Sequence, residues 1–391
     1  MTNWLQRPAA AEGVARAPGA HSDPSLPWTA VMPLQPESES AGPPQSCLVQ
    51  GKAGGTFWRL ALALWLGVTA SRGQSLRDLP PGVEVRDYTG WANCLFLNAS
   101  ERPVQVVIVP EVGGRIVHYS LNGANILLEN SMSQGALLGS KNEDLFLGGY
   151  QCDAAAGARL LPDHWQLSEG RQRWQADTNF SAEVFSQPDA TLGVALDKEF
   201  VLAGDTGELG LVQRLRNVSD KPVQYSLADR TSCKGGGFVL IPLNKKSRFK
   251  ARWAQARQAG GGQYYDGDHP NSPEVSVLGG VLVAQTGGYA TRLGADSDGQ
   301  WIAYARGRLL FVKYYLFSPR GEYGGGGHSV EVYFDRRVTE LDPLSPETTL
   351  APGASFIFPE KWVLLPLDKE VTTAEEARKL VVKIPPPPFR R

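Results

Sequence analysis

The feature that most constrains this chain is a long succession of short apolar segments separated by turn signals. From Val83 to about Leu367 strand and turn alternate, and no helical period of any length interrupts them. Many strands without interleaved helices favour a β-sandwich or barrel over a parallel α/β sheet. We therefore expect an all-β domain over residues 83–367. The predicted strands include Val104–Val109, Arg115–Leu121, Leu209–Asn217, Phe238–Pro242, Val275–Gln285 and His328–Phe334.

The stretch Pro103–Asn130 combines three predicted strands, the third a short one over Asn125–Leu128, with a glycine pair, Gly113 and Gly114. Glycine permits close approach of the backbone to a ligand, which makes the following Arg115 a candidate ligand-binding residue. A structural salt bridge is the competing role of this arginine. His118 follows Arg115 by three positions, and side chains of a strand alternate between faces. The two should therefore lie on opposite faces unless a bulge intervenes.

The N-terminal region has a different composition. Residues 1–56 are rich in Ala, Pro, Gly and Ser without an apolar period, and we expect them to be unstructured. Residues 57–73 resemble a secretory signal peptide, with the apolar run Leu60–Ala70 and small residues before a cut at Gln74. The predicted mature protein is exported, periplasmic or extracellular, without a stable membrane span. Because signal peptides begin a chain, Val49 is a candidate for the true first residue.

Three cysteines follow the predicted cut: Cys94, Cys152 and Cys233. One disulfide is possible in an oxidising compartment, and the sequence leaves its pairing open. At the other end, residues 372–391 predict a short helix and a Pro-rich tail. Thr373 is the expected N-cap of this helix, and the proline run 385–388 ends it.

Charge and motifs exclude several classes of function. The chain carries 39 Lys and Arg against 40 Asp and Glu, and this balance predicts no nucleic-acid partner and no anionic membrane partner. Nucleophile-elbow, P-loop and dinucleotide motifs are absent, and we expect no cofactor. The segment YYDGDHP, with Asp266, Asp268 and His269, lacks the other ligands of a Ca²⁺ loop. A tight loop and no metal site are expected there.

Three strings suggest a family: PEVGGRIVHYSLNGANILLEN, then LFLGGYQ followed by LLPDHW, then VTELDPLSPETTLAPGASFIFPEKWVLL. They resemble exported bacterial proteins of the DUF4380 type, which belong to the galactose mutarotase-like group. The resemblance covers about Tyr88–Leu365. It implies a large antiparallel β-supersandwich that binds carbohydrate, a mono- or oligosaccharide, on a concave sheet face.

Mutarotases use two histidines and a late glutamate on that face, and DLFLGGYQCD, where the first histidine is expected, contains none. Carbohydrate binding is therefore the leading expectation. An active sugar epimerase or lyase-like enzyme and a non-catalytic envelope scaffold are the alternatives.

Candidate site residues lie far apart in the sequence. A proline turn presents Asp163, His164 and Trp165, which offer hydrogen bonds and a stacking ring to a sugar. Strand alternation places Glu331 and Tyr333 on one face and His328 on the other, and Glu340 is a competing late carboxylate. The catalytic candidates are His164, Glu331 and Glu340; the ligand-binding candidates are Arg115, Asp163, Trp165, Tyr333 and His328.

Overall fold

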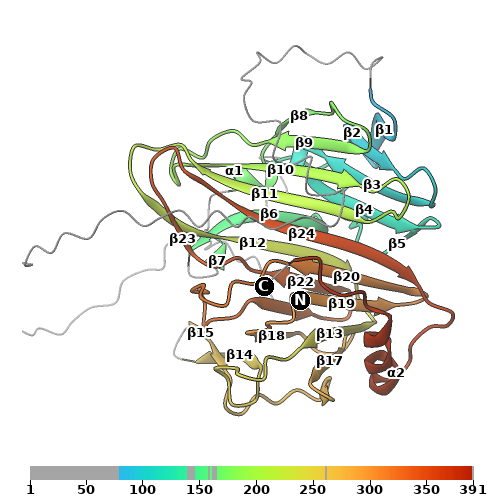
Figure 1. The fold of residues 1–391 in the computed structure, drawn as a ribbon, viewed down its shortest axis with the longest axis vertical. Coiled ribbons are helices and arrows are strands. Elements are labelled where there is room, and N and C mark those ends of the chain that lie inside the picture. The colour runs from blue at the N-terminus through green and yellow to red at the C-terminus, as the bar shows by residue number, and fades with distance from the viewer. Residues whose placement is uncertain (1–78, 139–145, 157–158, 161–164, 260–261, 390–391) are drawn as a thin grey trace, which may run out of the picture. The chain divides into compact units, whose positions relative to one another are not determined.

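Two antiparallel sheets form the body of the protein, which is described by a computed structural model (Figure 1). The structure describes residues 79–138, 146–156, 159–160, 165–259 and 262–389. Within these ranges the sheets have 14 and 10 strands, and we call them the large and the small sheet. The expected disordered extension, signal peptide and start at Val49 lie outside the described residues, as do Asp163 and His164.

The large sheet runs in the order β1-β2-β3-β4-β6-β12-β22-β21-β18-β14-β15, with β5, β7 and β23 attached beside β4, β6 and β12. Its strands are β1 (Val83–Tyr88), β2 (Trp91–Asn98), β3 (Val104–Val109), β4 (Arg115–Leu121), β5 (Ala124–Asn125), β6 (Gly149–Ala156), β7 (Arg159–Leu160), β12 (Val223–Lys234), β14 (Ala254–Ala259), β15 (Gly262–Asp266), β18 (Thr291–Ala295), β21 (Val330–Phe334), β22 (Val338–Pro343) and β23 (Thr348–Leu350).

The small sheet runs in the order β16-β17-β13-β19-β20-β24-β11-β10-β9-β8. Its strands are β8 (Arg173–Gln175), β9 (Ser181–Phe185), β10 (Val194–Leu202), β11 (Leu209–Asn217), β13 (Phe238–Pro242), β16 (Val275–Leu278), β17 (Val281–Gln285), β19 (Trp301–Arg306), β20 (Leu309–Tyr315) and β24 (Ser355–Pro366). The helices are short: η2 (Pro110–Val112), η3 (Ser131–Ser133), α1 (Gln166–Glu169), α2 (Ala374–Lys379) and η4 (Leu380–Lys383).

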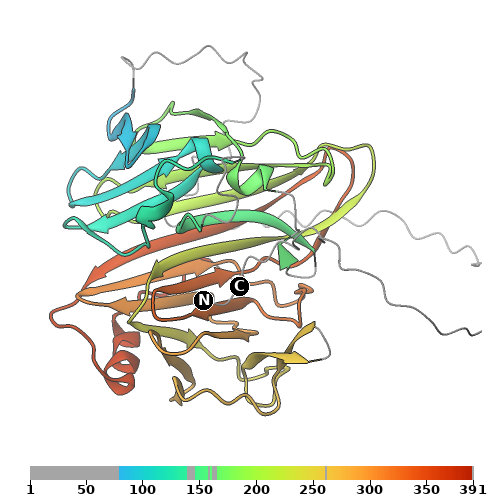
Figure 2. The same cartoon turned by 180° about the vertical axis from the view of Figure 1, so that it is seen from behind.

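The main hydrophobic core lies between the two sheets. Alternate residues of each strand supply it, such as Ile116 and Leu341 from the large sheet and Leu211 and Phe311 from the small sheet. A second cluster on the opposite face of the small sheet packs Leu240 and Val312 against Ala377 of α2. The helix thus covers that face, at the red end of the chain in Figures 1 and 2. Within the described ranges, no helix is long and apolar enough to cross a membrane.

Several sequence predictions are confirmed. The fold is an antiparallel β-sandwich with a short C-terminal helix, and the Thr373 side chain caps that helix by accepting a hydrogen bond from the Glu376 N–H. The segment at Asp266 is a tight loop, because its Oδ1 accepts from the backbone N–H groups of Asp268 and His269.

Other predictions need correction. Cys94, Cys152 and Cys233 are all free and buried, so no disulfide joins them. The strand expected over Val275–Gln285 is a hairpin instead, β16 and β17, which turns at Gly279 and Gly280. Both glycines have positive φ, which a continuous strand does not allow.

A β-bulge in β4 overturns the expected separation of Arg115 and His118. Val107 of β3 pairs with His118, whereas Ile108 pairs with Ile116, so Val117 is an extra residue. Val109 pairs with Arg115, and Val107 and Val109 share a face of their strand. Arg115 and His118 therefore lie on the same face, the one turned away from the sandwich core.

The glycine pair before β4 is required by packing as well as by backbone conformation. Gly113 has φ +72°, and a Cβ atom there would lie 1.9 Å from the Ser168 carbonyl oxygen of α1. Gly123 has a similar φ of +76°, but no atom lies within 4 Å of the place that a Cβ atom would take there. Comparing the same substitution at these two glycines therefore separates the free-energy cost of a left-handed backbone from the cost of a steric clash.

We expect Gly113→Ala to destabilise the protein by about 1–3 kcal/mol more than Gly123→Ala, because only the first substitution forces a backbone shift. Both variants share the left-handed backbone penalty of about 1–2 kcal/mol. Urea unfolding followed by tryptophan fluorescence measures the difference. Equal stability of the two variants would show that α1 yields freely to the added methyl group.

Candidate functional site on the outer face of the large sheet

The outer face of the large sheet, which points away from the core, carries a row of polar side chains. Strand pairing sets their order: Arg115 of β4 lies opposite Gln151 of β6, by extension of the Ile116–Tyr150 pair, and Gln151 pairs with Arg230 of β12. Farther along, Asp342 of β22 pairs with Glu331 of β21, and Glu340 pairs with Tyr333. Arg292 of β18 pairs with Tyr333. Six neighbouring strands, in the order β4, β6, β12, β22, β21 and β18, thus direct charged or polar side chains to one side of the sheet.

Arg292 is the centre of this row. Its Nη1 donates to Glu331 Oε2 at 2.7 Å and lies 4.0 Å from Asp342 Oδ2, and its Nη2 lies 3.6 Å from Glu340 Oε2. Its guanidinium carbon is 5.8 Å from the centre of the Tyr333 ring. We call these five residues the arginine cluster: Arg292, Glu331, Tyr333, Glu340 and Asp342. One cation therefore faces three carboxyl groups.

His328 joins the cluster, contrary to the expected strand alternation. Strand β21 begins at Val330, so His328 lies in the preceding segment and is free of the alternation that governs Glu331. Its ring packs over Gly294, where a Cβ atom would lie 2.4 Å from the His328 ring, and it contacts the rings of Phe249 and Tyr265. Its Nδ1 lies 3.6 Å from Glu331 Oε1.

Burial decides the protonation of the cluster. Burial and the neighbouring Glu340 raise the pKa of Asp342 to about 8, although Arg292 opposes the shift. Burial alone would lower the pKa of Arg292, but Glu331 and the other carboxyl groups hold it above its ordinary value. Burial lowers the pKa of His328, so its ring is neutral at pH 7. The cluster thus combines the Arg292 cation with three carboxyl groups, of which Asp342 retains its proton near neutral pH.

Arg115 lies at the other end of the row and is almost completely buried, with 3% of its surface exposed. Its Nη1 donates to the Gly148 carbonyl at 2.7 Å and its Nη2 to Gln151 Oε1 at 2.5 Å. Both acceptors are neutral. Burial lowers the pKa of Arg115 to about 10, with the field of Arg230 acting in the same direction and that of Glu169 opposing it.

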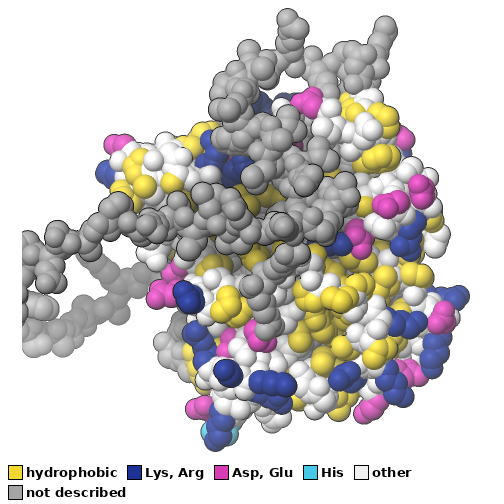
Figure 3. Space-filling view, viewed as in Figure 1, with side chains coloured by type: hydrophobic (Ala, Val, Ile, Leu, Met, Phe, Trp, Pro, Cys, Tyr) yellow, Lys and Arg dark blue, Asp and Glu magenta, His cyan; other side chains and the backbone are white. Residues whose placement is uncertain are grey.

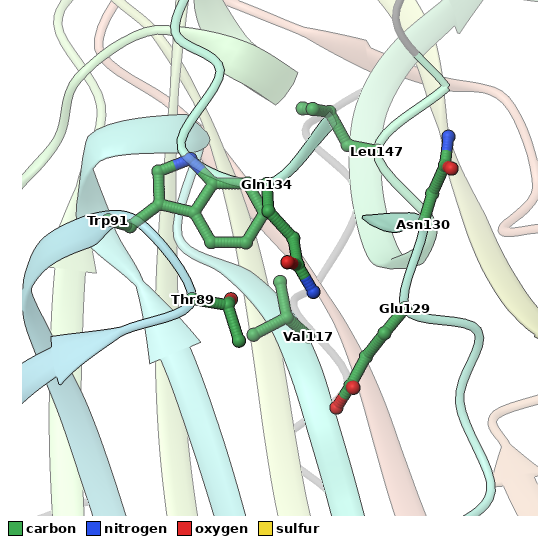
Figure 4. Close-up of a pocket in the computed structure, with 7 residues that line it drawn as sticks. All are labelled: Thr89, Trp91, Val117, Glu129, Asn130, Gln134 and Leu147. Atoms are coloured by element: carbon green, nitrogen blue, oxygen red, sulfur yellow. The ribbon is translucent and has the colours of Figure 1, made fainter. Parts of the chain in front are cut away.

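A second polar cluster surrounds His118 on the same sheet face. Its Nδ1 lies 2.9 Å from Glu129 Oε1, which also accepts hydrogen bonds from Tyr88 and Asn125 at 2.7 Å each. Hydrogen bonding by His118 lowers the pKa of Glu129 to about 2. Figure 4 shows the adjacent shallow pocket, lined by Thr89, Trp91, Val117, Glu129, Asn130, Gln134 and Leu147.

The structure brings together four residues that the sequence singled out: Glu331, Tyr333, Glu340 and His328. Arg115 shares their sheet face, with Gln151 and Arg230 in between. Trp165 lies half buried at the start of α1. Sequence reasoning missed Arg292, Asp342 and Gln151. The alternation of Glu340 and Asp342 in VTELDP was a usable signal, because residues two apart in a strand share a face.

The described surface mixes charges of both signs. Figure 3 shows Lys and Arg side chains interspersed with Asp and Glu among hydrophobic groups. This fits the formal net charge of −1. In contrast, the charged side chains of the outer-face row are largely buried. Buried charges in one place mark the row as a candidate functional site.

Comparison with known proteins yields likenesses of fold only. No family model matches the chain, and no curated protein matches it. A galactose mutarotase-like protein from Lactobacillus casei is 13% identical, with a TM-score of 0.49, and the match covers 70% of this chain and 100% of that one. A galactose mutarotase-like protein from Clostridium acetobutylicum is 11% identical, with a TM-score of 0.46, and the match covers 74% and 100%. The class that the strands themselves define is an antiparallel β-sandwich with a charged outer face.

Proposed function

We propose that this protein binds a carbohydrate on the outer face of the large sheet, at the arginine cluster. The observation that carries the proposal is the convergence of Arg292 with three carboxyl groups from two strands. Among the described residues, Asp342 Oδ1 and both ring nitrogens of His328 are buried without a hydrogen-bond partner. Buried polar atoms without partners are costly, and a ligand that supplies partners would offset that cost.

Sugar hydroxyl groups suit this chemistry. Each hydroxyl donates one hydrogen bond and accepts others, so it can bind a guanidinium and a carboxylate at once. The Tyr265 ring beside His328 and the Tyr333 ring beside Arg292 add apolar surface for the C–H face of a sugar. A few convergent polar groups with aromatic neighbours are typical of small-molecule sites.

The resemblance of PEVGGRIVHYSLNGANILLEN and VTELDPLSP to exported proteins of the DUF4380 type supports the same proposal. Under it, the protein acts outside the cytoplasm, in the periplasm or beyond the cell, on mono- or oligosaccharides. His164, Asp163 and Trp165 remain candidates for further contacts to the sugar.

Glu340→Gln tests the proposal. The change keeps the size of the side chain but removes the charge that faces Arg292 and Arg230. We expect sugar affinity of the full chain to fall at least about tenfold, because a hydrogen bond to a charged group contributes about 1.5–3 kcal/mol. Isothermal titration calorimetry with a panel of mono- and oligosaccharides measures the effect.

Glu183→Gln, which alters a carboxylate on the small sheet that accepts a hydrogen bond from Gln175, is the matched control and should leave affinity unchanged. If the wild-type chain binds no sugar of the panel, the proposed function is wrong. If both glutamine variants bind like the wild type, the site lies elsewhere.

Acid–base chemistry on the sugar is a second candidate function, and one observation favours it. Asp342 keeps its proton near neutral pH, whereas Arg292 holds the adjacent Glu331 as an ion pair. A proton donor beside a carboxylate is the pair that epimerisation requires. Polarimetry of freshly dissolved hexoses would show accelerated mutarotation, and a rate equal to that of buffer would exclude this candidate.

A further inference from the structure

Arg115 is a buried cation without a carboxylate counterion. No ion pair to it exists among the described residues, and its two hydrogen bonds go to the neutral oxygens of Gly148 and Gln151. Its Nε is buried without a partner. Buried arginines are normally paired, because taking an isolated charge out of water is costly. An anion that bound here would remove that cost.

Two further hydrogen-bond donors lie beside Arg115 on the same sheet face, on the next two strands. Gln151 lies opposite it on β6, and Arg230 pairs with Gln151 on β12, so the two arginines are two strand spacings apart, about 10 Å. The Gln151 side-chain oxygen accepts from Arg115, which leaves its NH₂ group as a donor. The contact of Arg230 with a carboxylate is long, 3.9 Å to Glu340. Side chains of this length can reach one group between them.

The charges of the row are unevenly distributed. The carboxyl groups gather at Arg292, whereas Arg115 has no carboxylate within ion-pair distance among the described residues and Arg230 has only the long contact to Glu340. Glu169 acts on Arg115 through its field alone. Like charges at this spacing repel each other in a buried setting, and the field of Arg230 does act on Arg115. A bound oxyanion would neutralise this end of the row and satisfy the planar donors of both guanidinium groups.

We propose that the ligand is an anionic sugar, whose carboxylate or phosphate group binds between Arg115 and Arg230 while its hydroxyl groups reach the arginine cluster. This inference rests on the proposed carbohydrate site and adds the charge of the ligand. Gln151 contributes a neutral donor to the same oxyanion. The site selects acidic sugars over their neutral counterparts, because a neutral hydroxymethyl group would leave the Arg115 cation buried and unpaired.

The test is calorimetric titration of the full chain at low salt with three matched sets of sugars. Galactose and glucose are the neutral set, galacturonate and glucuronate carry a carboxylate, and glucose 6-phosphate carries a phosphate. We expect one anionic set to bind about tenfold to a hundredfold more tightly than the neutral set, as a charge-assisted hydrogen bond implies. The better anionic set identifies the oxyanion.

Arg115→Met and Arg230→Met should each reduce this preference, measured as the ratio of anionic-sugar to neutral-sugar affinity in the same variant. Arg216→Met is the matched control, since Arg216 pairs with Asp197 on the small sheet. Equal affinity of the wild-type chain for neutral and anionic sugars overturns the inference but leaves the proposed function standing. Binding of neither set overturns both. The wild-type comparison decides the question even if an arginine variant fails to fold.

Discussion

Replacing Lys313 by methionine should lower the free energy of unfolding by about 3–5 kcal/mol, the cost of stranding buried charges. Lys313 of β20 lies in the core between the sheets and is completely buried. Its Nζ donates to Asp229 and Thr231 of β12 at 2.7 Å each, and Glu360 of β24 lies 3.5 Å away. The ammonium group thus links the small sheet to the large sheet through Asp229 and Thr231, while Glu360 of its own sheet lies close by.

The protonation of this network explains why the lysine is indispensable. Burial, and then the proximity of Glu360, raise the pKa of Asp229 well above its usual range. Lys313 therefore balances one carboxylate, and the second carboxyl group keeps its proton. Without the ammonium group, the remaining charge would face neutral donors such as the Trp362 indole N–H, which already donates to Glu360 at 2.8 Å.

Guanidinium chloride unfolding at pH 7 measures this effect. Lys361→Met is the control, because Lys361 lies on β24 and forms a partly exposed pair with Glu208 at 2.5 Å. Such pairs contribute less than about 1 kcal/mol. At acidic pH the deficit of Lys313→Met should shrink as the stranded carboxylate takes up a proton. A loss below about 1 kcal/mol at pH 7 would mean that the network contributes little to the sandwich.

The second large effect is a pH dependence of the folding stability, which we expect Asp342 to cause. Asp342 has a folded-state pKa of about 8, above the usual 3.8, so the folded state retains a proton that the unfolded chain releases between these values. Because the folded state then binds more protons, stability falls as pH rises from about 4 to about 8, by up to about 1.4 kcal/mol per pH unit. Below pH 4 both states are protonated and the penalty vanishes.

Asp342→Asn removes this titration. We expect the variant to match the wild type near pH 4 and to exceed its stability by about 5 kcal/mol near pH 8, with a flatter profile between. Asp153, whose pKa burial raises to about 7, contributes a slope of the same sign over a narrower pH range in both proteins. Thermal unfolding across this pH range tests the expectation, with Lys361→Met as a control of unchanged slope. Parallel profiles for wild type and Asp342→Asn would contradict it.

Much of the sandwich could be predicted because its strands have the required local patterns. Val104–Val109, Leu209–Asn217 and Phe238–Pro242 are apolar or alternating runs between turns, and their predicted bounds agree with the structure. Strands β6 and β18 were missed. GYQCDAAA and TRLGA contain Gly, Ala and Asp, which have low strand propensity, and pairing with better strands forms them.

The missed strands explain the missed site residues. Gln151 comes from β6 and Arg292 from β18, so neither could be assigned to the outer face before the strands themselves were known. Glu331 and Tyr333 could be proposed because their strand is apolar at alternate positions, and Glu340 because the family resemblance implies a late glutamate. Their convergence on one arginine depends on the pairing of β18, β21 and β22, segments separated by up to about 40 residues.

The sequence by itself determined the all-β class, most strand positions, the capped C-terminal helix and the face on which Glu331 and Tyr333 lie. These properties depend on local periodicity and turn chemistry, which neighbouring residues encode. Only the tertiary structure decided that a bulge at Val117 places Arg115 and His118 on one face, that His328 packs over Gly294, and that Arg292 binds the late carboxylates. Strand order and register set these contacts, and both arise from packing between residues distant in the chain.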